Sequence, residues 1–198
     1  MLKIGITGSI GSGKTTVCQI FETLGIPVYY ADNRGKYLLQ NNENVKAQVL
    51  AAFGEGIQGS GHSIDRNLLA QIVFDNPAKL ATLEKIVHPA VYEDFNNWSV
   101  SKKSPYIIKE AALLFEAGSY KELDKIITVA APFETRLQRV LKRSHISEEQ
   151  VRARESRQWP EEQKIEMADF VIYNDERHLL MPQVLELHKV FLSLNHEQ

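Results

Sequence analysis

Short apolar runs rich in β-branched residues recur along the chain and predict the strands of one sheet. The first run, LKIGIT at 2–7, is followed by others at 26–30, 105–109, 124–131 and 169–174. Helical patterns separate these runs, an order that is typical of parallel strands joined by crossover helices. The pattern therefore predicts an α/β fold with a five-stranded, mainly parallel sheet and helices on both of its faces.

The stretch between the second and third strands is longer than an ordinary loop. It carries helical periodicity at 44–53, 65–74 and 80–98, and the glycine-rich segment GEGIQGSGHS separates the first two patterns. Loops without secondary structure of their own rarely exceed about 15 residues. We therefore expect residues 32–104 to form a helical insertion within a single domain spanning 1–198. Its core would be about 1–31, 105–135 and 165–198.

His88 and Pro89 lie inside the third of these helical patterns. The residue before a proline is pushed away from helical dihedral angles, which predicts a kink there. The alternative is that His88 contacts a substrate, although a lone histidine is more often structural.

Arginines are concentrated after the fourth strand, where two helices are predicted. Residues 133–143 have a helical pattern, and Ser147 with Gln150 forms a capping box for the next helix. Two interpretations compete for this region: a solvated helix surface laced with salt bridges, or a lid at about 136–164 that closes over phosphates.

The lid interpretation is favoured for Arg139 and Arg143, which lie one helical turn apart and face the same way. The lid interpretation is not favoured in the same way for the neighbouring arginines. Arg136 is ranked below this pair, and both interpretations stay open for Arg152, Arg154 and Arg157.

The segment GITGSIGSGKTT, residues 5–16, lies between the first strand and a helix that should begin near Lys14. Its spacing, Gly8-x-x-x-x-Gly13-Lys14-Thr15, is the phosphate-binding P-loop pattern. Glycines allow the backbone N–H groups to converge on an anion, and the helix directs its positive end at the same place. Lys14 can reach the β- and γ-phosphates, and the Thr15 hydroxyl can bind Mg²⁺.

The order strand, glycine loop, helix favours a nucleoside triphosphate site over a simple glycine-rich turn. The nucleotide-binding set predicted in this way consists of Gly8, Gly11, Ser12, Gly13, Lys14, Thr15 and Thr16, with Arg139 added from the lid.

Composition narrows the classes of partner and compartment. The net charge of −2 gives no overall attraction to nucleic acid or to an anionic membrane, so neither partner is expected. A single cysteine, Cys18, excludes an internal disulfide and suits a reducing cytoplasm; we expect it to fill the core. No apolar run approaches the roughly 18 residues that span a bilayer, and the first strand leaves no place for a signal peptide.

Three carboxylates follow predicted strands and are candidates for the chemistry. Asp32 comes after the second strand, where it could accept a proton from an attacking hydroxyl or act as the N-cap of the next helix. Glu110 and Glu116 follow the third strand, and each could hold a metal through water or anchor a loop. Position in the sequence alone does not decide between base and N-cap for Asp32, or between metal binding and loop anchoring for Glu110 and Glu116.

Other nucleotide-binding classes lack their sequence signatures here. A GTPase switch protein normally carries Asn-Lys-x-Asp for guanine, and this tetrapeptide does not occur. An ATPase acting on nucleic acid would need basic or aromatic strips, which the charge balance does not offer. A small-molecule kinase with a helical acceptor insertion and an arginine-bearing lid remains.

The chain resembles the dephospho-CoA kinase family from end to end. The resemblance is carried by GITGSIGSGKTT, YYAD, IDRNLLAQIVF, LEKIVHPAVYEDF, ALLFE, ETRLQRVLKR and MADFVIYN. It implies transfer of the ATP γ-phosphate to the ribose 3′-hydroxyl of dephospho-CoA, the last step of coenzyme A synthesis. A nucleoside or nucleoside-monophosphate kinase of the same architecture is the alternative.

The resemblance also implies roles for residues. It makes Asp32 the general base and assigns Lys14 to phosphate and Thr15 to Mg²⁺. It assigns the lid pair, Arg139 and Arg143, to the phosphates or base of ATP. The insertion, with Arg66 and His88, would shape the pocket for the CoA-side substrate.

Three positions depart from the family pattern. Ser9 stands where a second glycine is usual, and Thr15 replaces the commoner serine without changing the chemistry. Ala112 stands where proline usually precedes LLFE, which predicts a less rigid loop there. None of the three changes removes a reacting group.

Overall fold

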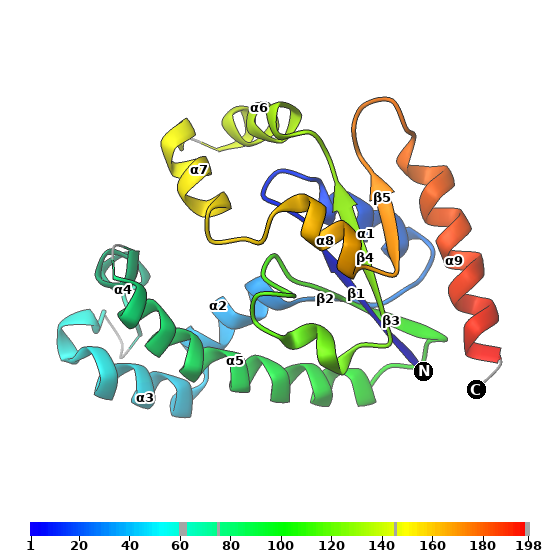
Figure 1. The fold of residues 1–198 in the computed structure, drawn as a ribbon. Coiled ribbons are helices and arrows are strands. Elements are labelled where there is room, and N and C mark those ends of the chain that lie inside the picture. The colour runs from blue at the N-terminus through cyan, green and yellow to red at the C-terminus, as the bar shows by residue number, and fades with distance from the viewer. Residues whose placement is uncertain (60–62, 75, 145, 197–198) are drawn as a thin grey trace. The chain divides into compact units, whose positions relative to one another are not determined.

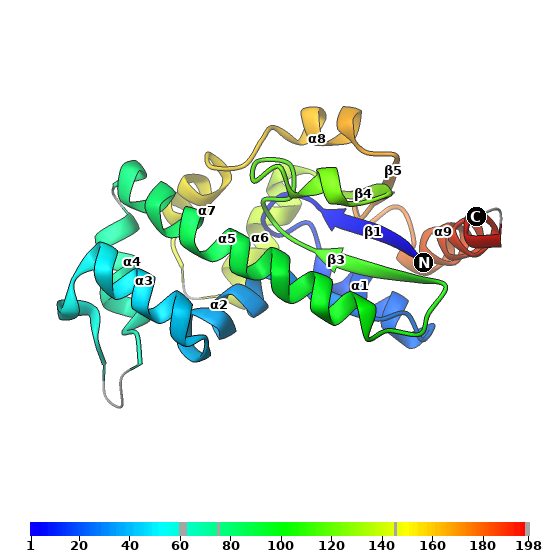
Figure 2. The same ribbon diagram turned by 90° about the horizontal axis from the view of Figure 1, so that it is seen from below.

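The computed structural model describes residues 1–59, 63–74, 76–144 and 146–196 (Figures 1 and 2). The chain forms two compact units, one made of Met1–Tyr30 with Lys102–Gln198 and the other of Ala31–Ser101.

The strands among the described residues belong to the first unit and form one sheet. They are β1 (Leu2–Thr7), β2 (Val28–Tyr30), β3 (Tyr106–Glu110), β4 (Lys125–Ala130) and β5 (Phe170–Tyr173). Their order is β2-β3-β1-β4-β5, and every neighbouring pair is parallel. This confirms the predicted five-stranded α/β fold.

The register of the sheet places the end of β1 at its ligand-binding edge. Ile6 lies opposite Glu110 of β3 on one side and Ile127 of β4 on the other. In sequence, β2 follows β1 but lies beyond β3 on one side of it, whereas β4 lies on the other side. The strand order therefore changes direction beside β1. In open α/β sheets, ligands bind at such a switch point, outside the carboxyl ends of the strands.

The core of this unit lies between the sheet and two helices. Helix α1 (Lys14–Thr23) and helix α9 (Leu180–His196) pack against each other and against β3. Every residue of β3 is buried, which requires cover on both faces of the sheet. The fully buried side chains of this core include Ile4, Ile6, Ile108, Ile127, Val17, Phe21, Val184 and Phe191.

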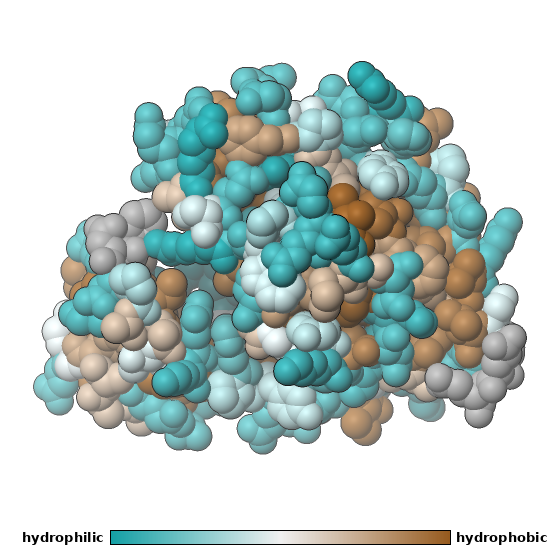
Figure 3. All heavy atoms as spheres, viewed as in Figure 1, coloured by the Kyte–Doolittle hydropathy of each residue, from teal (hydrophilic) through white to brown (hydrophobic). Residues whose placement is uncertain are grey.

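Two details of these helices bear on the sequence predictions. Cys18 is buried in the core as expected, and burial raises the pKa of its thiol. Gly25 follows the end of helix α1 at Thr23; it has a φ of +81°, and its N–H donates to the carbonyl of Glu22. On α9, Met181 and Leu185 remain exposed, and Figure 3 shows apolar and polar atoms interspersed over this helix.

The second unit consists of helices with a small core of its own. They are α2 (Ala31–Asn41), α3 (Glu43–Phe53), the short η1 (Glu55–Ile57), α4 (Arg66–Phe74) and α5 (Pro77–Val100). The buried core residues are Leu39, Val45, Val49, Ile57, Ile64, Leu69 and Val73. This unit overlaps the predicted insertion, and residues 60–62 of its glycine-rich segment lie outside the described residues.

Helix α5 continues through Pro89, so the proline does not end it. The helices α2, α3 and α4 all pack against α5. Arg34 of α2 forms an ion pair of 2.6 Å with Asp94 of α5. Whether the helix is kinked at His88 stays a prediction.

The arginine-rich region forms three helices of the first unit: α6 (Phe133–Arg143), α7 (Glu148–Glu155) and α8 (Glu161–Met167). The capping box of Ser147 and Gln150 is present as predicted. A separate apolar cluster holds α6 and α7 together through Leu137, Val140 and Val151, with Ile10 packed against it. A short helix, η3 (Ser119–Glu122), precedes β4. In the described part of the chain, no helix has the length and apolar character needed to cross a membrane.

Candidate active site

The glycine loop between β1 and α1 has the backbone shape of a phosphate cradle. Gly8, Gly11 and Gly13 all have positive φ. At Gly13, φ is +96°, and an added Cβ would lie 2.2 Å from the amide nitrogen of Asn174. A side chain at Gly13 is therefore excluded by conformation and by space.

The loop carries the side chains that the P-loop pattern requires. Lys14 is the first residue of α1, and its ammonium donates to the carbonyl of Gly8 at 2.8 Å. Thr15 and Thr16 follow in the first turn with exposed side chains. Among the described residues, the buried hydroxyls of Thr7 and Ser12 have no hydrogen-bond partner. Buried hydroxyls without a partner are available to a ligand. Together with a backbone cradle that has no room for side chains, they fit a polyanionic ligand with its metal ion.

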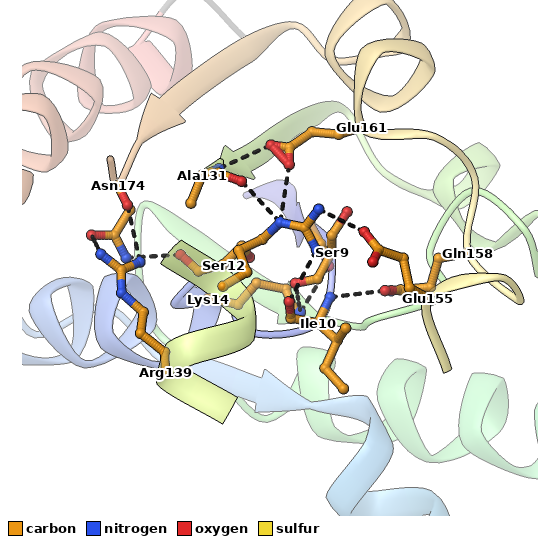
Figure 4. A network of polar contacts seen from close by, with 12 residues as sticks. Ser9, Ile10, Ser12, Lys14, Ala131, Arg139, Glu155, Gln158, Glu161 and Asn174 are labelled. Carbon is orange, nitrogen blue, oxygen red and sulfur yellow. Dashed lines mark hydrogen bonds and ion pairs between the residues drawn. The ribbon is translucent and has the colours of Figure 1, made fainter. Parts of the chain in front are cut away.

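Asn174, directly after β5, connects the loop to helix α6 (Figure 4). Its amide donates to the carbonyl of Ser12 at 2.8 Å. Its own backbone carbonyl accepts from Arg139 at 2.9 Å, and the guanidinium of Arg139 also lies 3.6 Å from Glu176. The structure thus links Arg139 to the P-loop through Asn174. The sequence analysis did not identify Asn174.

Arg143 and Arg152 are exposed on helices α6 and α7. Arg143 ends α6, and no hydrogen bond or ion pair connects its side chain to another described residue. Arg152 pairs with Glu148 one turn away at 2.6 Å, as in the interpretation of a solvated helix surface. Arg154 and Arg157 are also exposed.

Arg136 has a larger structural role than the sequence analysis gave it. Its guanidinium is buried and donates to the carbonyls of Ala131 at 2.8 Å and of Ile10 at 3.3 Å. It pairs with Glu155 at 2.6 Å and with Glu161 at 3.4 Å. Burial raises the pKa of the Glu161 carboxyl, and the charge of Arg136 opposes this shift. Substituting Arg136 would therefore unpair several buried groups, so it cannot serve as a neutral comparison for Arg139.

Glu116 acts as an anchor in the structure. Its carboxylate accepts from the backbone N–H of Trp159 at 2.7 Å and lies 3.2 Å from the ammonium of Lys164. Lys164 is fully buried; desolvation lowers its pKa, and the Glu116 charge opposes this. The ring of Trp159 stacks on Phe115 with 5.8 Å between centroids. Of the two roles left open for Glu116, this geometry supports anchoring.

Three predicted substrate-side residues belong to the helical unit. Asp32 is the second residue of α2 and is exposed, so it does not have the position of an N-cap. Arg66 begins α4 and lines a pocket of about 490 Å³ with Gln40 and Asp65. His88 is exposed on α5.

Comparison with known proteins identifies close relatives. A family model described as dephospho-CoA kinase matches residues 2–179. A dephospho-CoA kinase from Bacteroides fragilis is 39% identical over 187 residues, which cover 94% of this chain and 91% of the relative.

Two solved structures have the same fold over nearly their whole length. A crystal structure from Thermus thermophilus has a TM-score of 0.85 at 36% identity, covering 96% of each chain. A dephospho-CoA kinase from Campylobacter jejuni has a TM-score of 0.70 at 28% identity, covering 98% of each chain.

Proposed function

The chain belongs to the dephospho-CoA kinase family, which makes it an enzyme of the final step of coenzyme A synthesis, and we propose that it phosphorylates the ribose 3′-hydroxyl of dephospho-CoA. ATP is the phosphate donor, and the products are coenzyme A and ADP. The family match carries this conclusion, because it covers both the P-loop and the helical insertion. The alternative, a nucleoside or nucleoside-monophosphate kinase, is therefore not retained. Release of ADP in the presence of dephospho-CoA tests the assignment.

The P-loop is proposed to hold the phosphates of ATP. The positive φ of its glycines, the position of Lys14 and the start of α1 support this role. The Thr15 hydroxyl is a hard oxygen ligand at the start of α1 and would hold Mg²⁺, which neutralises phosphate charge when bound. Ser12 and Thr16 complete the set of residues around the phosphates.

Asp32 is proposed to be the general base for the acceptor hydroxyl. Its exposure and its position just after β2 support this role, since an exposed carboxylate can reach a substrate. Arg66 and His88 are proposed to contact the acceptor. The pocket beside Arg66 supports its assignment, because a guanidinium is suited to bind phosphate groups.

The cell compartment is proposed to be the cytoplasm. A composition with one cysteine, buried in the core, supports this location because disulfides are rare in reducing compartments.

Arg139→Ala is expected to lower kcat/KM for ATP by about 10- to 100-fold, the equivalent of one lost hydrogen bond to a charged group. The reason is its position beside the P-loop, where the guanidinium reaches Asn174. Arg143→Ala is expected to have an effect in the same direction. Steady-state kinetics with MgATP as the varied substrate measures both.

Arg152→Ala is the matched control, because it removes an exposed ion pair, worth at most about 1 kcal/mol, and a contact with the ring of Phe133. If Arg139→Ala, Arg143→Ala and Arg152→Ala all had the same kcat/KM for ATP, the lid interpretation would be wrong. Helices α6 and α7 would then be interpreted as a solvated helix surface.

A further inference from the structure

One peptide of the P-loop, at Ile10, is held by the lid region from several directions (Figure 4). Its N–H donates to the side-chain oxygen of Gln158 at 2.8 Å. Its carbonyl accepts from Arg136 at 3.3 Å. Its side chain packs against the apolar cluster that joins α6 and α7. The tip of the loop is thus fixed by contacts from outside the P-loop.

Gln158 uses both ends of its amide in these contacts. The oxygen accepts from Ile10, and the nitrogen donates to the carbonyl of Ala112 at 2.8 Å. Because a backbone N–H can only donate and a carbonyl can only accept, these partners define the orientation of the amide. Gln158 therefore joins the P-loop to the segment after β3.

The backbone on either side of Gln158 is itself fixed. Arg157 and Gln158 close the end of α7 through backbone bonds to Arg154 and Glu155. The next residue, Trp159, is bonded to Glu116 and stacked on Phe115. The amide of Gln158 is consequently presented to Ile10 from a rigid support.

A loop that binds phosphate through its backbone must place its N–H groups correctly before the ligand arrives. Ordering the loop at the moment of binding would reduce affinity, and a preordered loop avoids this cost. The Ile10 N–H is occupied by Gln158, and the N–H of Ser12 bonds to the carbonyl of Ser9 at 3.1 Å. These bonds constrain the loop next to the glycines that form the cradle.

We propose that Gln158 is a positioning residue for phosphoryl transfer: by holding the Ile10 peptide, it keeps the P-loop in the conformation that binds the phosphates of ATP. This inference rests on the proposed role of the P-loop. We expect its effect on nucleotide binding, because the oxygen of its amide bonds to the P-loop itself.

The test is Gln158→Met, which keeps the length of the side chain and removes both amide bonds. The Kd and the KM for MgATP are expected to rise about tenfold, the size of one to two lost hydrogen bonds. The KM for dephospho-CoA should stay within about twofold of wild type. Ser156→Ala is the matched control, because Ser156 is exposed and lies two residues from Gln158. As the C-cap residue of α7, it bonds through its hydroxyl to the carbonyl of Ala153.

Equal MgATP affinity in Gln158→Met and Ser156→Ala would overturn the inference while leaving the kinase assignment intact. Equal increases in both KM values would also overturn it, because they would indicate a general loss of structure. A wild-type protein that fails to bind MgATP would instead refute the role of the P-loop itself.

Hydrogen exchange of the wild-type protein without nucleotide gives a second test that does not depend on the variant folding. The Ile10 amide should be protected, since it is bonded to a half-buried side chain. Exchange at the rate of an open loop amide would contradict the proposal.

Discussion

Lys14→Ala is expected to lower kcat by about 10³-fold, because removing a preorganised donor from developing transition-state charge has effects of this size. The ammonium of Lys14 already lies against the loop, 2.8 Å from the carbonyl of Gly8. There it can meet the negative charge that grows on the bridging oxygen as ADP leaves. The measurement is kcat at saturating MgATP and dephospho-CoA, with the melting temperature as a check on folding.

Lys189→Ala on α9 is the control for charge, since this lysine is exposed and lies on a helix away from the loop. It should stay within about twofold of the wild-type kcat, as is usual for surface substitutions. Kinetics close to wild type for Lys14→Ala would contradict the placement of Lys14 in the active site.

Asp32→Asn is expected to lower kcat by about 10²- to 10⁴-fold, the range for loss of a positioned general base. This corresponds to roughly 3–5 kcal/mol of barrier. Asparagine keeps the size of the side chain and removes the carboxylate that accepts the proton. Affinity for MgATP should change little, because the proposed base acts on the acceptor. Single-turnover and steady-state rates, with a binding titration for MgATP, separate these effects.

Asp32 also lies in the first turn of α2, where a negative charge stabilises a helix by about 0.3–1 kcal/mol. Glu43→Gln is the matched control, because Glu43 is an exposed acidic residue in the first turn of α3 in the same unit. It loses the same kind of helix interaction and should keep the wild-type kcat. If Asp32→Asn also kept it, Asp32 would not be the base, and Glu110, buried at the end of β3, would be the next candidate.

Local sequence signals predicted the parts of the fold that depend on neighbours along the chain. The capping box of Ser147 and Gln150 spans three residues, and α6 occupies the residues that its pattern predicted. The five strands were predicted because each is a short apolar run between helical patterns. Helix α5 continues through Pro89, and the kink that the proline predicts there stays a prediction.

The contacts around the P-loop could not be predicted in the same way. Gln158 is bonded to a residue 148 positions earlier, and Asn174 to one 162 positions earlier. A glutamine at a helix end and an asparagine after a strand are ordinary surface residues by pattern. Arg136 gave no signal of burial either, because its partners come from three separate segments. Only the folded chain brings these groups together.

The central claim is that dephospho-CoA accepts the γ-phosphate of ATP. An assay of ADP release tests this claim most directly, with dephospho-CoA compared against a panel of nucleosides and nucleoside monophosphates under the same MgATP concentration. We expect dephospho-CoA to support turnover and the panel to give only the background rate. Turnover with members of the panel and none with dephospho-CoA would contradict the account.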